Sequence, residues 1–502
     1  MLRTNILANL AGSGWIAVLT LIATPIQIHL LGVEAYGLIG LITVLQIVFN
    51  TLDLGLSASV TQTVAADRSP GRAESAPLTN SVGTIYGLMA ILIAGLLWLT
   101  ASLIATRWLK PDTLDSETVL AAVRAIGLYV AFRWPISFYT GVLSGIQRMD
   151  VLNLLKAGAA TVRLGVGIAV ILAWPDIVLF LAWFAASALV ELVAFAIATH
   201  RLVPELRPMV RISWPAIRSV WKFSATMAAI AVLSMLITQM DRIFVSKLLS
   251  LEAFGYYSLA YTTGIAISLL QVSLNNAALP AFAEAASHGR RELAQRYAKV
   301  SELTAFAVAL PCALLVFFGA DILRVWVNEE AARGAGLPLA LLSFGFFLNA
   351  AFSNAYLSAV ATRKANIPAT VNAIGILVYA PALYVLTARF GTVGAASGWV
   401  LLTVYYGFTL FPAVHRRVLH VPLLPSLWHG LAAPVLSAVL AVGGMRLAAN
   451  ILGSEYAIWI ALALAIPFYA LGGYLLTSTP LREAIRRSGA LAVIQPTRGA
   501  AR

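Results

Sequence analysis

The sequence predicts an all-α, polytopic membrane protein made of two parallel six-helix bundles and a C-terminal helix pair. Three observations support this fold class. The 502 residues are 60% hydrophobic and only 11% charged, whereas soluble domains are about 25% charged. Apolar runs of ~20 residues, the length of a membrane-spanning helix, recur along the whole chain. The third observation is an internal repeat that divides most of the chain into similar halves.

Fourteen segments are apolar and long enough to cross a bilayer, where helices satisfy the backbone polar groups internally. Twelve spans are the alternative, because the last two segments differ most from the rest. We expect the first segment to be retained, since no convincing signal-peptide cleavage site follows it. The predicted spans are residues 6–31, 36–64, 81–106, 118–146, 151–173, 176–199, 219–245, 254–283, 298–319, 337–361, 366–388, 392–414, 430–452 and 456–478.

The loops between these segments are short. The longest polar gaps, residues 200–218 and 284–297, are too small to form a soluble domain. The predicted organisation is therefore an N-terminal bundle at 1–210, a second bundle at 211–420, and a helix pair with a basic cytoplasmic tail at 421–502.

Lysine and arginine are distributed unevenly over the predicted loops. With the N-terminus in the cytoplasm, 22 of the 34 Lys and Arg residues fall on the cytoplasmic side, 8 fall outside and 4 lie within spans. Cytoplasmic loops are enriched in basic residues, so both termini are predicted to be cytoplasmic. This bias and contact with anionic lipid explain the net charge of +13, and nucleic acid is not an expected partner.

The internal repeat is carried by two short turns. His29–Gly37 (HLLGVEAYG) and Lys247–Gly255 (KLLSLEAFG) match at an offset of 218 residues, and Leu143–Arg148 matches Leu357–Arg363 at about 214. Six spans per half give both halves the same orientation, a plan that transporters use. A duplicated channel is less consistent, because no loop resembles a selectivity filter. In the turns, Glu34 and Glu252 are expected to cap the helices that follow them.

The sequence carries few signs of catalysis. Cys312 is the one cysteine, the six histidines are scattered, and no phosphate-binding glycine loop is present. We therefore expect no enzyme activity, no cofactor and no metal site.

Several segments resemble one family of transporters. They are Asn9–Pro25, Leu30–Leu38 and Leu52–Ser57 in the first half, and Asp241–Leu249 with Gly255–Ala260 in the second. Together they resemble the polysaccharide transporter family, the O-antigen and exopolysaccharide flippases of the multidrug/oligosaccharidyl-lipid/polysaccharide exporter superfamily. The resemblance extends through residue 414, and relatives have twelve or fourteen spans.

The resemblance implies a flippase that moves undecaprenyl-pyrophosphate-linked oligosaccharide across the bacterial inner membrane by alternating access, with H⁺ or Na⁺ coupling. It also implies polysaccharide polymerase or export proteins as partners. Two alternatives remain. One is another exporter of the superfamily, for drugs or a peptidoglycan lipid precursor. The other is a membrane-embedded polysaccharide polymerase or ligase, although such enzymes need a sizeable periplasmic loop.

A lipid-linked diphosphate needs a cationic site, and charged residues inside a membrane are costly unless they serve such a purpose. The predicted substrate-binding residues are therefore Arg133, Arg163, Arg124 and Lys156. Arg133 is the strongest candidate, because Arg can bind phosphate oxygens in a bidentate manner and Pro135 frees backbone groups nearby. A structural ion pair with a nearby acid is the alternative.

The predicted ion-coupling or gating residues are the acids Asp53, Glu191 and Asp241, together with Arg242. Asp53 is expected to pair with Arg133 or Arg163, or to take part in coupling. Asp241 and Arg242 are candidates for an outer gate. Pro25 and Pro135 are the predicted hinges for alternating access, with kinks that only aid packing as the alternative.

Overall fold

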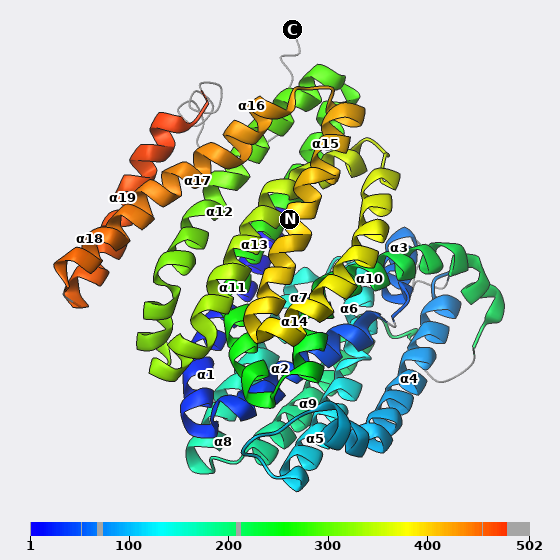
Figure 1. Ribbon diagram of the computed structural model, residues 1–502. Coiled ribbons are helices and arrows are strands. Elements are labelled where there is room, and N and C mark those ends of the chain that lie inside the picture. The colour runs from blue at the N-terminus through cyan, green and yellow to red at the C-terminus, as the bar shows by residue number, and fades with distance from the viewer. Residues whose placement is uncertain (1, 52, 68–73, 207–211, 454, 479–502) are drawn as a thin grey trace. The chain divides into compact units, whose positions relative to one another are not determined.

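The computed structural model describes residues 2–51, 53–67, 74–206, 212–453 and 455–478, and every regular element within them is a helix (Figure 1). The chain divides into two compact units, Met1–Gly255 and Tyr256–Arg502. The predicted all-α fold class is therefore confirmed. This division into compact units does not test the domain boundaries predicted at residues 210 and 420, so those boundaries stay a prediction. The predicted basic tail after residue 478 lies outside the described residues.

The first unit contains ten α-helices, two π-helical turns and the start of an eleventh helix within its described residues. In order they are α1 (Leu2–Leu31), α2 (Val33–Thr51), α3 (Leu56–Ala66), α4 (Ala76–Leu103), η2 (Ile104–Trp108), α5 (Ser116–Arg133), α6 (Ile136–Gly145), α7 (Met149–Thr161), η3 (Val162–Val166), α8 (Gly167–Ala173), α9 (Ile177–Leu202), α10 (Trp214–Leu248) and the first turn of α11 (Leu251–Ser287).

The second unit contains the rest of α11 and the C-terminal elements. In order they are α12 (Arg290–Trp326), α13 (Glu329–Ala361), α14 (Asn366–Phe408), α15 (Leu410–Val414), η4 (His415–Leu419), α16 (Leu423–Leu427), η5 (Trp428–Ala432), α17 (Ala433–Ala438), η6 (Val439–Gly443), α18 (Gly444–Leu452) and α19 (Glu455–Leu476).

Twelve helical segments among the described residues are long and apolar enough to cross a membrane, so the chain is a multi-pass membrane protein. One of them, Asn366–Leu419, spans 54 residues and contains a break at Gly391, where φ is 60° and ψ is −139°. Glycine adopts this conformation because it lacks a Cβ atom. The 35-residue helix α10 is not among the twelve. The choice between twelve and fourteen spans therefore stays a prediction.

In the first unit, α5 packs against α9 and α4, α3 lies against α6, and α1 lies against α7. Small and aliphatic side chains make these helix contacts; Val119, Ala122 and Ile126 on α5 are fully buried. Helix α10, which corresponds to the first span of the second repeat, packs on α2, α3 and α4. The Oγ atoms of Ser59 on α3 and Ser224 on α10 are 2.8 Å apart, within hydrogen-bonding distance.

Two predicted spans contain breaks. The first was not indicated by the sequence, whereas the second lies at Pro135, where a break was expected. The span predicted at 36–64 ends as helix α2 at Thr51 and resumes as α3 at Leu56, with positive φ values at Leu54 and Gly55. The span predicted at 118–146 is interrupted between α5 and α6, where Pro135 has no N–H to continue the helix. Both breaks place polar side chains at membrane depth.

The carboxylate of Glu34 has a different role from the one predicted. Instead of capping its own helix α2, it accepts hydrogen bonds from the backbone N–H groups of Asp112, Thr113 and Leu114, at 2.7, 2.8 and 3.2 Å, and from the Thr113 hydroxyl. These residues form the loop before α5. The expected cap fails because a loop distant in the sequence presents three N–H groups to the same carboxylate.

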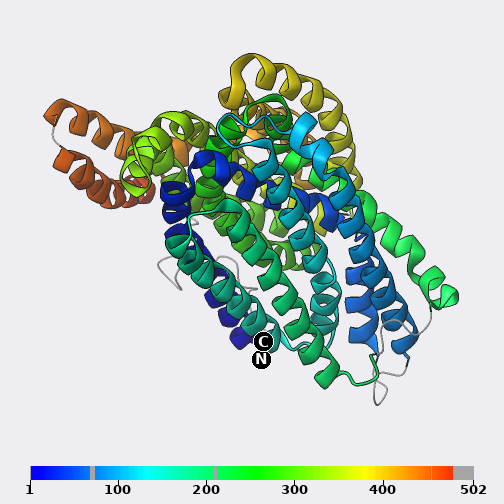
Figure 2. The ribbon, with the colours of Figure 1, turned by 90° about the horizontal axis from the view of Figure 1, so that it is seen from below.

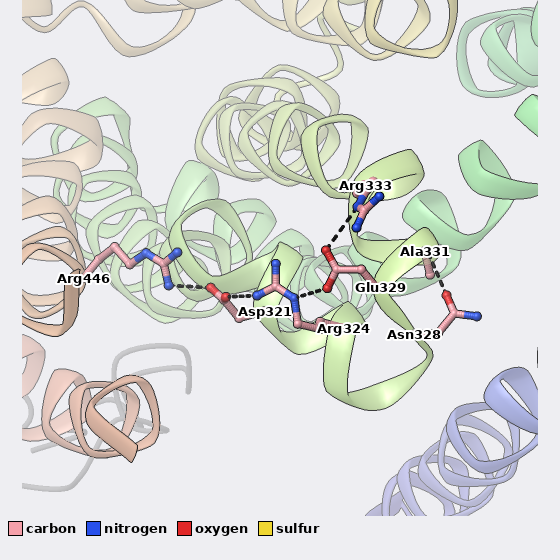
Figure 3. Close-up of polar contacts among 7 residues, drawn as sticks. All are labelled: Asp321, Arg324, Asn328, Glu329, Ala331, Arg333 and Arg446. Carbon is pink, nitrogen blue, oxygen red and sulfur yellow. Dashed lines mark hydrogen bonds and ion pairs between the residues drawn. The ribbon is translucent and has the colours of Figure 1, made fainter. Parts of the chain in front are cut away.

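In the second unit, α12 packs along α13, and α13 packs along α14. The C-terminal helices α17, α18 and α19 form a hairpin, seen side by side in Figure 2. Elements η5, α17 and α19 contact α12. An ion pair joins one end of this hairpin to α12, where Arg446 on α18 contacts Asp321 near the end of α12 (Figure 3).

Candidate functional site

A cavity of about 550 Å³ lies inside the first unit. Its walls come from eight elements, α1, α2, α3, α5, α6, α7, η3 and α9. Three of the four predicted substrate-binding residues line it, together with one of the predicted acids. The lining residues are Ile16, Gln46, Asn50, Ser57, Ala58, Thr61, Arg133, Ile136, Ser137, Thr140, Gly141, Ser144, Lys156, Arg163 and Glu191.

Glu191 holds two arginines at the wall of this cavity. Its Oε2 atom accepts a hydrogen bond from Arg133 Nη1 at 2.5 Å and one from Arg163 Nη1 at 2.9 Å. The carboxylate is 3% exposed, whereas the side chains of Arg133 and Arg163 are 22% and 14% exposed. The acid is therefore buried behind its partners, and the guanidinium groups remain accessible from the cavity.

The backbone around both arginines is irregular. Arg133 is the last residue of α5, immediately before the Trp134–Pro135 break. Arg163 lies in the π-helical turn η3, and its carbonyl oxygen accepts a 3.0 Å hydrogen bond from Trp183 Nε1. π-Helical turns widen a helix locally and are frequent at functional sites. The Tyr129 ring lies beside both groups, with its centroid 5.9 Å from each guanidinium carbon.

Lys156, exposed on α7, is the third cation of the cavity. The ionisable lining is therefore three cations, Arg133, Lys156 and Arg163, against the single carboxylate of Glu191, a formal charge of +2. In a low-dielectric environment, uncompensated charge of this kind favours an anionic ligand. The arrangement can bind an anion; it contains no nucleophile paired with a base.

Neutral polar side chains complete the lining, and the sequence analysis missed them. They are Gln46, Asn50, Ser57, Thr61, Ser137, Thr140 and Ser144. Their spacing was the available signal: Gln46 and Asn50, like Ser57 and Thr61, stand four residues apart and so share a helix face. Polar residues at that spacing inside apolar spans mark a surface turned away from lipid.

Asp53 does not form the expected pair with Arg133 or Arg163, because Glu191 occupies both arginines. The Asp53 carboxylate instead accepts hydrogen bonds from the Ser57 hydroxyl at 3.0 Å and the Ser57 N–H at 3.3 Å. It therefore caps the start of α3 and orients a serine that lines the cavity.

The remaining predicted residues lie elsewhere in the first unit. The Arg124 guanidinium stacks over the Trp98 ring at 4.9 Å and is not among the cavity-lining residues. Asp241 and Arg242 are buried on α10, and Arg242 donates a hydrogen bond to Gln239. Pro25 lies inside α1, which continues through it, whereas Pro135 separates α5 from α6. The roles predicted for these residues are not tested by the geometry.

These features define a multi-pass membrane protein with a cationic internal cavity. A sequence profile of the family described as "Polysaccharide biosynthesis protein" matches residues 28–326, more than half of the chain. The chain therefore belongs to this family, and the family resemblance found in the sequence is confirmed. A Shigella flexneri protein named as a candidate O-antigen transporter is 21% identical over 399 residues, which cover 77% of this chain and 92% of that protein.

Solved structures share the fold. The lipid II flippase MurJ, in an inward closed conformation, matches with a TM-score of 0.74 and 14% identity over 94% of this chain and 98% of that one. An inward-facing multidrug resistance MATE family transporter of the MOP superfamily matches with a TM-score of 0.61 and 12% identity over 80% of this chain and 96% of that one. These likenesses establish the fold of MOP-superfamily transporters.

Proposed function

We propose that this protein is a flippase that moves undecaprenyl-diphosphate-linked oligosaccharide from the cytoplasmic to the periplasmic leaflet of the bacterial inner membrane. The observation that carries the proposal is the cavity in the first unit, which is lined by three cations and one buried carboxylate. A diphosphate is an anion that two guanidinium groups and an ammonium group can bind by charge-assisted hydrogen bonds. Membership of a polysaccharide biosynthesis family supports a glycosylated lipid as the cargo.

Transport by alternating access requires a hinge and a source of energy. Pro135 lies directly between Arg133 and the cavity-lining helix α6, so bending at this break moves Arg133 relative to Ser137 and Thr140. Pro25 is the second proposed hinge. Glu191 is the proposed site of coupling to H⁺ or Na⁺, because its charge decides whether the two arginines are occupied internally or available to the cargo.

The proposed orientation places both termini in the cytoplasm, in agreement with the excess of basic residues on that side. The positive cavity disfavours cationic drugs as cargo. A peptidoglycan lipid precursor also carries undecaprenyl diphosphate, so the sugar must be varied in the test. Polysaccharide polymerase and export proteins are the proposed partners for the released cargo.

Reconstitution into proteoliposomes tests the proposal. The lipid-linked repeat unit, isolated from a strain that lacks this protein and labelled with a fluorophore, is incorporated with the protein, and a membrane-impermeant quencher reports its movement between leaflets. We expect quenching of the inner-leaflet pool only when the protein is present. Movement of labelled phosphatidylcholine at the same rate would contradict the proposal, as would faster movement of the peptidoglycan precursor.

A further inference from the structure

Four uncharged polar side chains form two hydrogen-bonded pairs in the middle of α11 and α13, within the second unit. Asn349 Nδ2 donates to Gln271 Oε1 at 3.2 Å, and Ser353 Oγ donates to Asn275 Oδ1 at 3.1 Å. Gln271 and Asn275 are four residues apart on α11, and Asn349 and Ser353 are four apart on α13. Each pair of residues therefore shares one helix face, and we call the four residues the amide strip.

The amide strip lies in helix segments that carry no ionisable acid or base. No Asp, Glu, Lys, Arg or His occurs between Glu252 and Glu284 on α11, or between Arg333 and Arg363 around α13. The cationic cavity of the first unit is different in kind, because four charged side chains line it. The second unit therefore offers hydrogen-bonding groups at membrane depth without net charge.

The two pairs leave part of their hydrogen-bonding capacity unused. Among the described residues, the Gln271 and Asn275 NH₂ groups and the Asn349 carbonyl oxygen have no hydrogen bond. These atoms are not among the fully buried polar atoms without a partner, so each keeps some accessible surface. Asn275 and Asn349 are half-buried, and Gln271 is 7% exposed. An amide facing hydrocarbon would cost several kcal/mol per unsatisfied group. The strip is therefore expected to face water or a polar ligand.

The internal repeat relates this strip to the cavity of the first unit. At the offset of 218 residues, Gln271 corresponds to Asp53 and Asn275 corresponds to Ser57, which lines the cavity. At the offset of 214, Arg133 corresponds to residue 347, two positions before Asn349. The second repeat thus places neutral amides at the positions of Asp53 and its hydroxyl partner Ser57, whereas Arg133 corresponds to the apolar Phe347.

We propose that the amide strip binds the carbohydrate portion of the cargo, through hydrogen bonds from Gln271, Asn275 and Asn349 to sugar hydroxyl groups. This inference rests on the proposed function and deepens it. A sugar hydroxyl both donates and accepts hydrogen bonds. The free NH₂ groups of the strip can donate to it, and the free carbonyl oxygen of Asn349 can accept from it. Because the strip is neutral, it discriminates between sugars without adding to the attraction for the diphosphate.

Two ligands separate this role from that of the cationic cavity. The purified full-length protein in detergent is titrated with the lipid-linked repeat unit isolated from a strain lacking this protein, and with sugar-free undecaprenyl diphosphate. Asn349→Ala and Asn275→Ala should weaken binding of the glycosylated lipid about tenfold, the loss expected for one or two hydrogen bonds. Both should change binding of the sugar-free lipid less than twofold.

The matched control is Ser273→Ala. Ser273 lies between Gln271 and Asn275 but projects from another side of α11, and its hydroxyl donates to the Leu269 carbonyl oxygen of its own helix. This variant should bind both lipids as the wild type does. Asn349→Gln, which retains both amide functions, should recover part of the lost affinity.

Other outcomes overturn the inference. If the alanine variants weaken binding of both lipids by the same factor, or only lower the melting temperature, the strip serves helix packing. A wild-type protein that bound both lipids equally would overturn this inference and leave the proposed function standing. A wild-type protein that bound neither lipid would overturn both.

Discussion

Gly255 lies so close to the backbone of Val33 that a Cβ atom at residue 255 would stand 2.1 Å from the Val33 carbonyl oxygen. The reverse contact is also closer than a Cβ atom allows, since a Cβ atom on Gly37 would stand 2.6 Å from the carbonyl oxygen of Leu251. Gly37 corresponds to Gly255, and Val33 to Leu251, at the repeat offset of 218. The two copies of the repeated turn therefore contact each other reciprocally, through their glycines.

This contact predicts that Gly255→Ala destabilises the protein by about 1–3 kcal/mol, because the new methyl group meets backbone that must shift. Thermal unfolding in detergent measures the effect. Gly95→Ala is the control, since a Cβ atom there meets nothing within 4 Å. Equal melting temperatures for the two variants would contradict this prediction, because they would show that the two turns can move apart without loss of stability.

A second prediction compares the two repeat-related glutamates. Glu34→Ala removes the acceptor of three loop N–H groups and of the Thr113 hydroxyl, and should cost about 1–3 kcal/mol of stability. Glu252→Ala should change stability by less than about 0.5 kcal/mol, because Glu252 is half-buried and has no side-chain hydrogen bond among the described residues. Chemical unfolding of both variants tests the difference, and similar losses would contradict it.

A third prediction concerns the cavity. Arg133→Ala should abolish polysaccharide export while the protein still accumulates in the membrane, because the cavity loses one of its three cations. Surface polysaccharide and membrane content are measured in a strain that lacks the chromosomal copy. Arg389→Ala, which changes an exposed arginine of the second unit, serves as the control. Normal surface polysaccharide in the Arg133 variant would remove Arg133 from the site.

A fourth prediction concerns the ion pairs drawn in Figure 3. Asp321, whose side chain is 9% exposed, binds Arg446 of α18 and Arg324, the latter at 2.8 Å. Asp321→Asn should cost about 2 kcal/mol, less than the 3–5 kcal/mol of a fully buried pair, because both arginines are partly solvated. Arg333→Ala should cost less than about 0.5 kcal/mol, since its side chain is 77% exposed. The denaturant midpoints of the two variants test this difference: Asp321→Asn should lower the midpoint more than Arg333→Ala, and equal midpoints would contradict the prediction.

The sequence predicted most helices because long apolar runs determine them; α9, at Ile177–Leu202, was predicted at 176–199. The break at Pro135 was predicted from the proline, but the break between α2 and α3 was harder to predict. Residues 53–55 sit in an apolar context without proline, and the turn depends on positive φ values at Leu54 and Gly55. Leucine rarely adopts that conformation, so the residue types in this segment did not indicate a turn.

The site was only partly predictable for a similar reason. Charge inside apolar segments identified Arg133, Lys156, Arg163 and Glu191 individually. Their grouping depends on the packing of α5, η3 and α9, which brings together residues 28 to 58 positions apart. The sequence left two roles open for Asp53. Its pairing with an arginine is not formed, because Glu191 is the acid that contacts both arginines, and its role in coupling stays a prediction. No sequence pattern ranks two acids by their distance from the same cation.

The last prediction concerns Glu191 and follows from competition for the arginines. Glu191→Gln removes the charge that Arg133 and Arg163 now share, so both groups become available to an anion. We expect sugar-free undecaprenyl diphosphate to bind this variant about tenfold more tightly, equivalent to about 1.4 kcal/mol. Transport should become slower, because the carboxylate no longer helps to displace the cargo.

The matched control is Glu117→Gln, which changes an exposed glutamate on α5 and should bind the sugar-free lipid and transport the cargo as the wild type does. If Glu191→Gln bound undecaprenyl diphosphate no more tightly than the wild type, the carboxylate would not compete with the cargo for Arg133 and Arg163, and the coupling group would lie elsewhere.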